Sequence, residues 1–249
     1  MADETRSSGG GEHAVELADV RFRWPGGERD ALAIERLAIE RGERVFVRGA
    51  SGSGKTTLLS LIGAIVAPRE GSVRVDGVEL GTLAGGARDT FRADRIGFVF
   101  QMFNLLPFLG LVDNVLLPCR FSARRAARAT AEGRSLEAEA RRLLATLGLD
   151  AEALARRPVS ELSVGQQQRV AAARALIGSP PIVVADEPTS ALDADARHDF
   201  IELLFTEVRA VGATLVFVSH DRALERAFDR AVELERLNVA RGPAPERLR

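Results

Sequence analysis

Short runs of apolar residues alternate with polar loops along the chain, a pattern typical of an α/β protein with a buried sheet. Apolar runs of strand length lie at 97–100, 182–185 and 214–218, and a helical pattern lies at 57–66. Because strands and helices alternate in this order, the sequence predicts a mostly parallel core sheet.

Two regions depart from this alternation. Segments 15–22, 44–47 and 71–78 are strand-like around Gly and Asp-Gly turns, which predicts an antiparallel β subdomain beside the core sheet. Between residues 102 and 166 the pattern becomes helical, and from 122 to 147 it is rich in Ala, Arg and Glu, which predicts an inserted α-helical subdomain. The charges there form a solvated face or, alternatively, a surface that contacts lipid headgroups.

Composition narrows the class of protein. The 249 residues carry a net charge of -1, so there is no overall positive field to hold a nucleic acid, and we expect no such partner. The single cysteine, Cys119, excludes an internal disulfide and a zinc site built on several thiols. No apolar run approaches the roughly 20 residues that span a bilayer, so we expect the chain itself not to cross a membrane.

The two ends of the chain differ from the rest. The first residues are acidic and rich in Ser and Gly, and they lack the apolar stretch of a signal peptide. We therefore expect a disordered lead-in at 1–13, one domain at 14–240 and a tail at 241–249.

A glycine-rich motif follows the strand at 44–47. The sequence GASGSGKTT fits G-x-x-x-x-G-K-[ST] in full, and its Lys55 is the only lysine in a chain with 34 Lys and Arg residues. Such a loop aims backbone N–H groups at a phosphate, its lysine bridges the β- and γ-phosphates, and the hydroxyl of Thr56 completes a Mg²⁺ shell. A Gly/Ser linker that matches by chance is the alternative. The predicted nucleotide-binding residues are Gly49, Ala50, Ser51, Gly52, Ser53, Gly54, Lys55, Thr56 and Thr57.

Two acidic residues end the apolar strand at 182–185. Asp186 lies where an aspartate can hold Mg²⁺, and Glu187, one residue further, can accept a proton from an attacking water. This pair predicts a nucleotide hydrolase. Taken alone, the pair also fits a strand end with solvated acids before the turn at Pro188.

The segment before that strand carries a third motif. Ser163, Val164, Gly165 and Gln166 follow Leu162 in LSVGQ, which resembles the LSGGQ signature of the ABC-type ATPases. The resemblance implies a P-loop NTPase fold and a head-to-tail dimer, because in that family the signature faces the γ-phosphate held by the partner. Val164 replaces the usual glycine, and a β-branched residue disfavours a positive φ there.

Four further features match the family in order and spacing. The resemblance implies that Trp24 stacks on adenine, that Gln101 reaches Mg²⁺ and the attacking water, and that His220 contacts the γ-phosphate and orients Glu187. Taken alone, Trp24 also fits ordinary core or turn packing, Gln101 fits a polar loop residue, and His220 fits a structural histidine. The resemblance also implies a D-loop, for which a helix N-cap at Ser190 is the alternative; its residues are Ser190, Ala191, Leu192 and Asp193.

Segments 103–108 and 113–115 resemble the stretch by which the lipoprotein-release, macrolide-efflux and cell-division ATPases grip a helix of their membrane subunit. Subdomain core is the alternative. The resemblance implies two copies that bind Mg-ATP, hydrolyse it through Glu187, and drive a separate polytopic membrane subunit in export or extraction of a lipoprotein, lipid or drug. We expect a homodimer, peripheral to the cytoplasmic face of the membrane. A soluble ABC-type ATPase that acts on nucleic acid or ribosomes is the second hypothesis.

Overall fold

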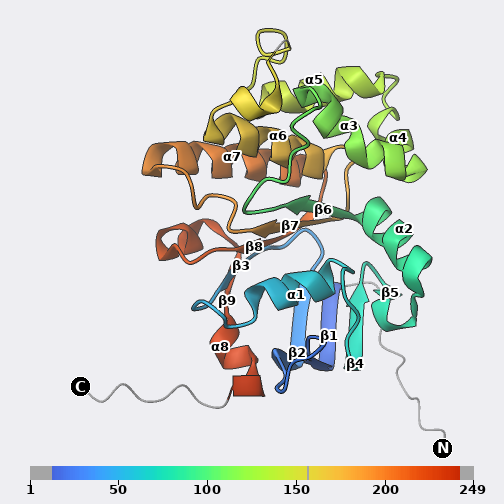
Figure 1. Cartoon of the computed structure of the whole chain (residues 1–249), viewed down its shortest axis with the longest axis vertical. Helices are drawn as coiled ribbons and strands as arrows, with labels where there is room; N and C mark the ends of the chain where they lie inside the picture. Colours follow the sequence, from blue (N-terminus) through green and yellow to red (C-terminus); the bar gives the residue numbers. More distant parts are fainter. Residues whose placement is uncertain (1–12, 156, 242–249) are drawn as a thin grey trace, which may run out of the picture.

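The computed structural model describes residues 13–155 and 157–241, which form three layers (Figure 1). A helical layer lies above a parallel sheet, and an antiparallel sheet lies below it, with helix α1 (Lys55–Ile62) between the two sheets. The predicted lead-in, apart from His13, and the tail beyond Arg241 lie outside the described residues. No described helix combines the length and apolar character needed to cross a membrane.

The core sheet is parallel throughout, as the alternation of strands and helices predicted. Its strand order is β6-β7-β8-β3-β9. Successive residues of a strand face opposite layers: Phe217 packs toward the helical layer, and Val216 and Val218 pack toward α1. The strands are β3 (Arg44–Arg48), β6 (Ile96–Val99), β7 (Ile182–Asp186), β8 (Thr214–Val218) and β9 (Arg230–Glu233).

The antiparallel sheet differs from its prediction in three ways, the first being a strand at 32–40 that was not predicted. The segment at 44–47 belongs to the parallel sheet as β3, where it pairs with β8 and β9. The predicted strand at 71–78 is two strands joined by a tight turn at Asp76 and Gly77, which both have positive φ. The order is β2-β1-β4-β5, with β1 (His13–Phe22), β2 (Leu32–Glu40), β4 (Glu70–Val75) and β5 (Val78–Glu79).

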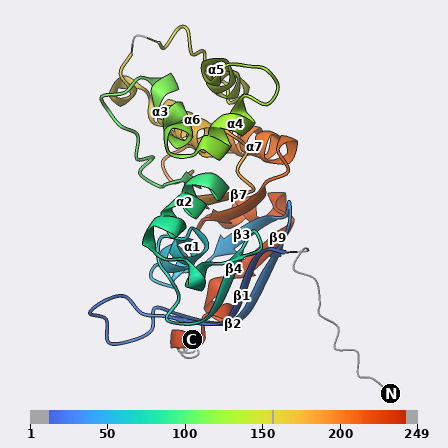
Figure 2. The same cartoon turned by 90° about the vertical axis from the view of Figure 1, so that its right-hand side faces the viewer.

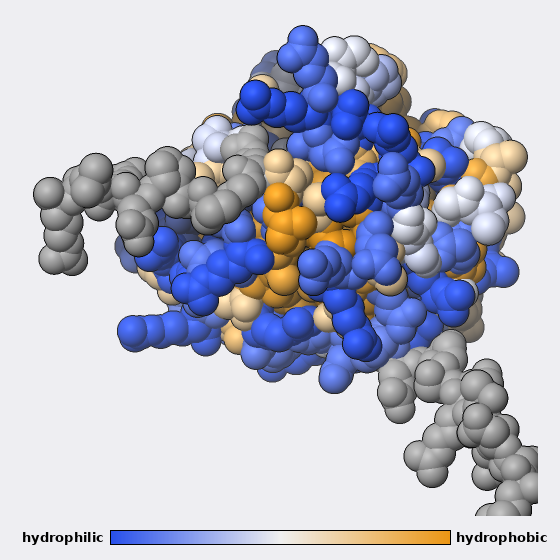
Figure 3. All heavy atoms as spheres, turned by 90° about the horizontal axis from the view of Figure 1, so that it is seen from below, coloured by the Kyte–Doolittle hydropathy of each residue, from blue (hydrophilic) through white to orange (hydrophobic). Residues whose placement is uncertain are grey.

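The lower end of the molecule is mostly hydrophilic, with a small hydrophobic area near its centre (Figure 3). Beside the lower sheet, helix α8 (Leu234–Leu237) follows β9 and is continued by a 3-10 turn, Val239–Arg241.

Helices form the upper layer, and Figure 2 shows them as a separate lobe above the sheets. A hydrophobic core that includes Leu143, Phe200 and Phe205 joins this layer to the parallel sheet. Helix α2 flanks β6 at the side of the sheets. The bounds are α2 (Gly85–Arg95), α3 (Leu111–Phe121), α4 (Ala123–Ala129), α5 (Leu136–Thr146), α6 (Val164–Leu176) and α7 (Ala194–Ala210), with 3-10 turns at Leu80–Thr82, Val159–Glu161 and Arg222–Ala227.

Arg125 in α4 is an exception to the prediction that the charges of this segment form a solvated face. Its side chain is buried, with the residue only 2% exposed, and its Nε donates to the carbonyl of Ile177 at 2.8 Å. Nη2 donates to the carbonyl of Ala175 at 2.6 Å, and Nη1 donates to that of Ile96 at 3.3 Å. Burial lowers the pKa of Arg125 to about 10, which leaves it protonated at neutral pH. Arg125 therefore ties α4 to the end of α6 and the start of β6.

Candidate functional site

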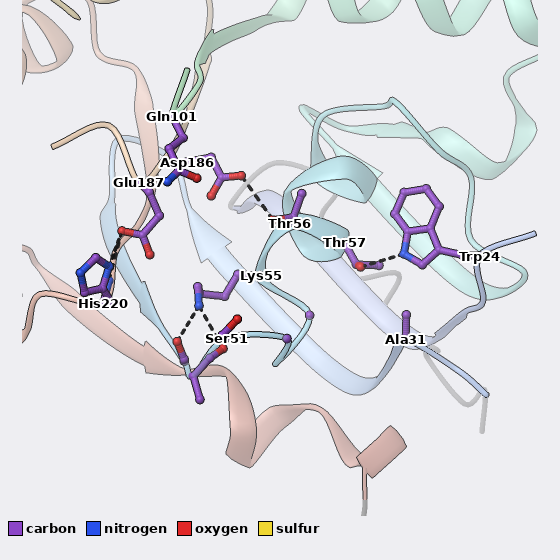
Figure 4. Close-up of a pocket in the computed structure, with 14 residues that line it drawn as sticks. Trp24, Ala31, Ser51, Lys55, Thr56, Thr57, Gln101, Asp186, Glu187 and His220 are labelled. Atoms are coloured by element: carbon purple, nitrogen blue, oxygen red, sulfur yellow. Dashed lines mark hydrogen bonds and ion pairs between the residues drawn. The ribbon is translucent and has the colours of Figure 1, made fainter. Parts of the chain in front are cut away.

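The glycine-rich loop joins β3 to α1. Gly52 and Gly54 have φ values of 76° and 106°, which favour glycine, and a Cβ at Gly49 would collide with the hydroxyl of Ser53. The ammonium of Lys55 donates to the carbonyls of Gly49 at 2.6 Å and Ala50 at 3.1 Å, so it lies over the loop (Figure 4). The loop therefore has the backbone shape that the motif predicted.

The loop opens into a cleft of about 590 Å³. Asp186, Glu187 and His220 lie at one end of it and Trp24 lies at the other, with Lys55 between them (Figure 4). Most of the sequence-predicted nucleotide and catalytic residues therefore lie together. The lining consists of Trp24, Ala31, Gly49, Ala50, Ser51, Gly52, Gly54, Lys55, Thr56, Thr57, Gln101, Asp186, Glu187 and His220.

Thr56 and Asp186 are brought together from α1 and β7. The hydroxyl of Thr56 donates to Oδ2 of Asp186 at 3.4 Å, so two oxygen atoms of the kind Mg²⁺ prefers lie side by side at the cleft. Burial, and then the charge of Glu187, raise the pKa of Asp186, against the opposing effects of Thr56 and Lys55. A partly buried carboxylate beside a second one favours a cation, so these residues fit Mg²⁺.

The raised pKa predicts a pH dependence for nucleotide binding. The protonated form of Asp186 is favoured in the fold, so the negative charge that would hold Mg²⁺ is lost at a higher pH than for an ordinary aspartate, whose pKa is about 3.9. We expect the gain in ATP affinity on adding Mg²⁺ to decrease as the pH falls through this raised pKa. Titrations of ATP with Mg²⁺ and with a chelator, across acidic to neutral pH, measure that gain.

Asp186→Asn is the matched control for this experiment, because its amide carries no charge at any of these pH values. The titration of ATP itself is common to both proteins and cancels in the comparison. Equal Mg²⁺ gains and equal pH profiles in the parent and in Asp186→Asn would show that Asp186 does not hold the cation.

Glu187 is held in one orientation by backbone and side-chain contacts. Its φ is 46°, and its N–H donates to the carbonyl of Val218 at 2.9 Å. Its Oε2 lies 2.8 Å from Nδ1 of His220, so with an ionised Glu187 the proton of the imidazole is on Nδ1. The Glu187 side chain is 12% exposed and that of His220 is 71% exposed. The Glu187 carboxylate is mostly shielded from solvent but lines the cleft, and this position suits proton abstraction from a water bound there.

Gln101 is the second residue after β6 and lines the same end of the cleft as Asp186 and Glu187 (Figure 4). Phe103 and Asn104, just beyond it, both have positive φ. The Arg174 guanidinium on α6 donates to their carbonyls, at 2.6 Å for Asn104. The segment that follows Gln101 is therefore attached to α6, the helix that begins at Val164.

Trp24 lies at the opposite end of the cleft, where the sequence predicts an adenine ring. Its indole N–H donates to the hydroxyl of Thr57 at 3.2 Å. Its ring packs edge-to-face on Phe22, with 5.0 Å between centroids. The side chain therefore makes packing contacts, as the alternative interpretation stated, and still contributes to the lining of the cleft.

Among the described residues that line the cleft, none belongs to the LSVGQ motif or the D-loop. Ser163 is the N-cap of α6, with a capping box in which Gln166 bonds back to its N–H at 2.9 Å. Val164 is the first helical residue, and its φ is not positive, so the expected conflict with a β-branched residue does not arise. A Cβ at Gly165 would lie 3.7 Å from Leu192, so the two motifs are neighbours.

The D-loop leads into α7, and the alternative interpretation of Ser190 as a helix N-cap is wrong. The N-cap is Asp193, whose carboxylate accepts from the N–H of Ala196 at 2.9 Å.

Two residues near the loop were missed by the sequence interpretation. Ala31 lines the cleft beside Trp24, but a small apolar residue in a turn carries no distinctive sequence signal. Glu235 in α8 accepts a hydrogen bond from the N–H of Ala50, a contact across 185 residues that no local motif reports. Both positions depend on tertiary packing alone.

Comparison with known protein families and sequences gives consistent results. A family model described as ABC transporter matches residues 33–190. The macrolide export ATP-binding/permease protein MacB 1 of Aeromonas hydrophila is 42% identical over 226 residues, which are 90% of this chain and 33% of that protein. The probable syringafactin export ATP-binding/permease protein SyfD of Pseudomonas syringae is 40% identical over 222 residues, 88% of this chain and 32% of that protein. The chain spans about a third of the length of these curated relatives.

Solved structures agree with this. A dimeric structure of MJ0796, a bacterial ABC transporter cassette, superposes with a TM-score of 0.75 at 35% identity, covering 89% of this chain and 95% of that one. A second dimeric structure of the MJ0796 cassette, in a post-hydrolysis state with ADP and Pi, gives a TM-score of 0.73 at 36% identity with the same coverage. The predicted α/β fold, with its parallel core, antiparallel sheet and helical layer, is confirmed.

Proposed function

Because the chain belongs to the ABC transporter family, as its motifs predicted, and is an ABC ATPase cassette, we propose that it binds Mg-ATP in the cleft and hydrolyses it to drive export by a membrane protein. One observation carries this proposal. The phosphate-binding loop, the Thr56 and Asp186 oxygens, and the Glu187 carboxylate paired with His220 all line one cleft.

Each residue has a separate task in this proposal. The loop amides and the Lys55 ammonium bind the phosphates, and Trp24 lies against the adenine. Thr56 and Asp186 would hold Mg²⁺, which would supply positive charge to the phosphate oxygens when bound. Glu187 accepts the proton of the attacking water, and His220 fixes its orientation through the 2.8 Å contact.

A second copy of the chain is part of the proposal. Ser163 and Gly165 lie outside the cleft of their own chain, at the start of α6, where a helix N-terminus favours an anion. The matching MJ0796 cassette structures are dimeric. A head-to-tail homodimer would place this helix start opposite the phosphates bound by the other copy.

The proposed contact with the membrane protein is a groove between α2, β6 and α3. It has a volume of about 630 Å³, and Phe98, Leu117 and Phe121 contribute apolar side chains to it. Phe121 is 78% exposed although it is a large apolar residue. Of the segments predicted to make this contact, Phe108 is 79% exposed, whereas Val115 is buried in the core.

The groove is connected to the cleft through Arg174. This residue lines the groove, and its guanidinium holds the carbonyls of Phe103 and Asn104, just after Gln101. A displacement of Gln101 on nucleotide binding would therefore move the wall of the groove and any helix docked there. The relatives are named as export ATP-binding/permease proteins, so we propose a polytopic permease as the partner, at the cytoplasmic face of the membrane.

Affinity purification tests this partner. The Glu187→Gln chain with Mg-ATP is recovered from detergent-solubilised membranes, and co-purifying proteins are identified by mass spectrometry. We expect a polytopic membrane protein in stoichiometric amount, and at least a tenfold lower yield with Phe121→Asp added, because a buried carboxylate opposes apolar docking.

Val239→Asp is the matched control, since Val239 is an exposed apolar residue away from the groove. It should leave the yield unchanged. Recovery of ribosomes or nucleic acid instead, or of the ATPase dimer alone, would favour the soluble ABC-type ATPase and contradict the export proposal.

A further inference from the structure

Asn238, directly after α8, is a buried side chain with four hydrogen bonds and no place in the proposed mechanism. The residue is 3% exposed. Its Oδ1 accepts from the N–H groups of Ala33 at 2.8 Å and Ala240 at 3.2 Å. Its Nδ2 donates to the carbonyls of Ser53 at 2.9 Å and Ala31 at 3.1 Å. The whole hydrogen-bonding capacity of the amide is therefore used.

Two of these partners, Ser53 and Ala31, connect the phosphate-binding loop with the Trp24 end of the cleft. Ser53 lies in the phosphate-binding loop, whereas Ala31 lines the end near Trp24 and Ala33 belongs to β2 of the antiparallel sheet. A Cβ on Gly54 would lie 3.1 Å from Asn238 Nδ2 and also 3.1 Å from the carbonyl of Ala31, so the three segments are packed closely there. One amide thus links the phosphate-binding loop to the Trp24 end of the cleft.

Glu235, on the same helical turn, is a second anchor. Its carboxylate accepts from the N–H of Ala50, and a Cβ on Gly49 would lie 3.2 Å from its Oε2. In Figure 4, α8 lies below the loop, on the side away from Gln101 and Asp186. Glu235 and Asn238 therefore bond the loop at the Ala50 N–H and the Ser53 carbonyl, on the side away from Asp186. Neither contact uses the other N–H groups of the loop, which can bind phosphates.

We propose that Asn238 and Glu235 are positioning residues for nucleotide binding: they hold the phosphate-binding loop against the adenine end of the cleft. This inference rests on the proposed ATP site. Neither side chain lines the cleft, so neither touches the nucleotide, and both act through the backbone. Their loss should weaken nucleotide binding and leave the chemical step intact.

Asn238→Asp tests this inference with an isosteric change. The carboxylate still accepts from Ala33, but it cannot donate to Ser53 or Ala31 and faces their carbonyl oxygens instead. We expect the dissociation constant of a fluorescent ATP analogue, and the KM for ATP, to rise at least tenfold, with kcat at saturating ATP within about twofold of the parent. A purely structural role would lower the melting temperature without this split between KM and kcat.

Asn114→Asp is the matched control. Asn114 is also buried, and its Nδ2 donates to the carbonyls of Leu106, Leu109 and Gly110 in the helical layer. The same chemical change should lower the melting temperature there and leave the dissociation constant unchanged. Equal effects of both variants on nucleotide binding, or parental binding by Asn238→Asp, would overturn the inference.

Glu235 provides an independent test, since its side chain is exposed and its removal does not endanger the fold. Glu235→Ala should raise the dissociation constant severalfold, and Glu235→Gln, which keeps an oxygen acceptor for the Ala50 N–H, should restore it. Parental binding by Glu235→Ala would overturn this part of the inference. A parent chain that binds no ATP would overturn the proposed function itself, and the inference with it.

Discussion

Replacing Glu187 by Gln should lower the rate of ATP hydrolysis about 10²- to 10⁴-fold while ATP binding is retained, because the amide keeps the shape of the side chain but cannot accept a proton. The carboxylate is 12% exposed and lies 2.8 Å from His220, so it is shielded and oriented where a water can reach it from the cleft. The loop, Thr56 and Asp186 remain in place to bind Mg-ATP.

Three measurements check this expectation: phosphate release at saturating ATP, binding of a fluorescent ATP analogue, and molar mass by light scattering. With hydrolysis blocked, the head-to-tail dimer should accumulate when Mg-ATP is present and dissociate when it is removed. A Ser163→Arg substitution in the same chain should abolish that dimer, because it places a bulky cation at the start of α6.

Glu225→Gln is the matched control for the rate. Glu225 is a partly exposed carboxylate that pairs with Arg48 at 2.9 Å and does not line the cleft. Its replacement should change the hydrolysis rate less than twofold. Hydrolysis by Glu187→Gln at the parental rate would contradict the role of Glu187 as general base.

The parts of the site that the sequence predicted are those with a local cause. The loop from Gly49 to Thr57 needs glycine at positions 52 and 54 because their φ values are positive. This requirement can be recognised in a short stretch of consecutive residues. Asp186 ends an apolar strand, which places it where the carboxyl ends of the strands of a parallel sheet meet. Such features depend on residues that are neighbours in the chain, so a single sequence is enough to predict them.

The parts that were missed depend on which segments meet in space. The strand at 44–47 was recognised, but its placement beside β8 and β9 is decided by side-chain packing on both of its faces. The expectation of backbone strain at Val164 was wrong because it assumed a positive φ, whereas Val164 is the first residue of a helix. The contacts of Asn238 and Glu235 with the loop likewise join segments far apart in the chain.

Arg125 gives the second large expected effect, on stability. Arg125→Met keeps the length of the side chain but leaves the carbonyls of Ala175 and Ile177 without their donor. An unsatisfied buried polar group costs about 1–3 kcal/mol, and removal of a buried charge offsets part of this. We therefore expect the free energy of unfolding to fall by about 3 kcal/mol, measured by denaturant titration with the slope checked for constancy.

Arg124→Met is the matched control. Arg124 is the preceding residue on the same helix, and its side chain is 53% exposed, 4.0 Å from Asp94 at its Nε. A weak, exposed ion pair of this kind contributes little, so the substitution should change the free energy of unfolding by less than about 0.5 kcal/mol. If the two variants were equally stable, the buried guanidinium would not be what ties α4 to α6 and β6.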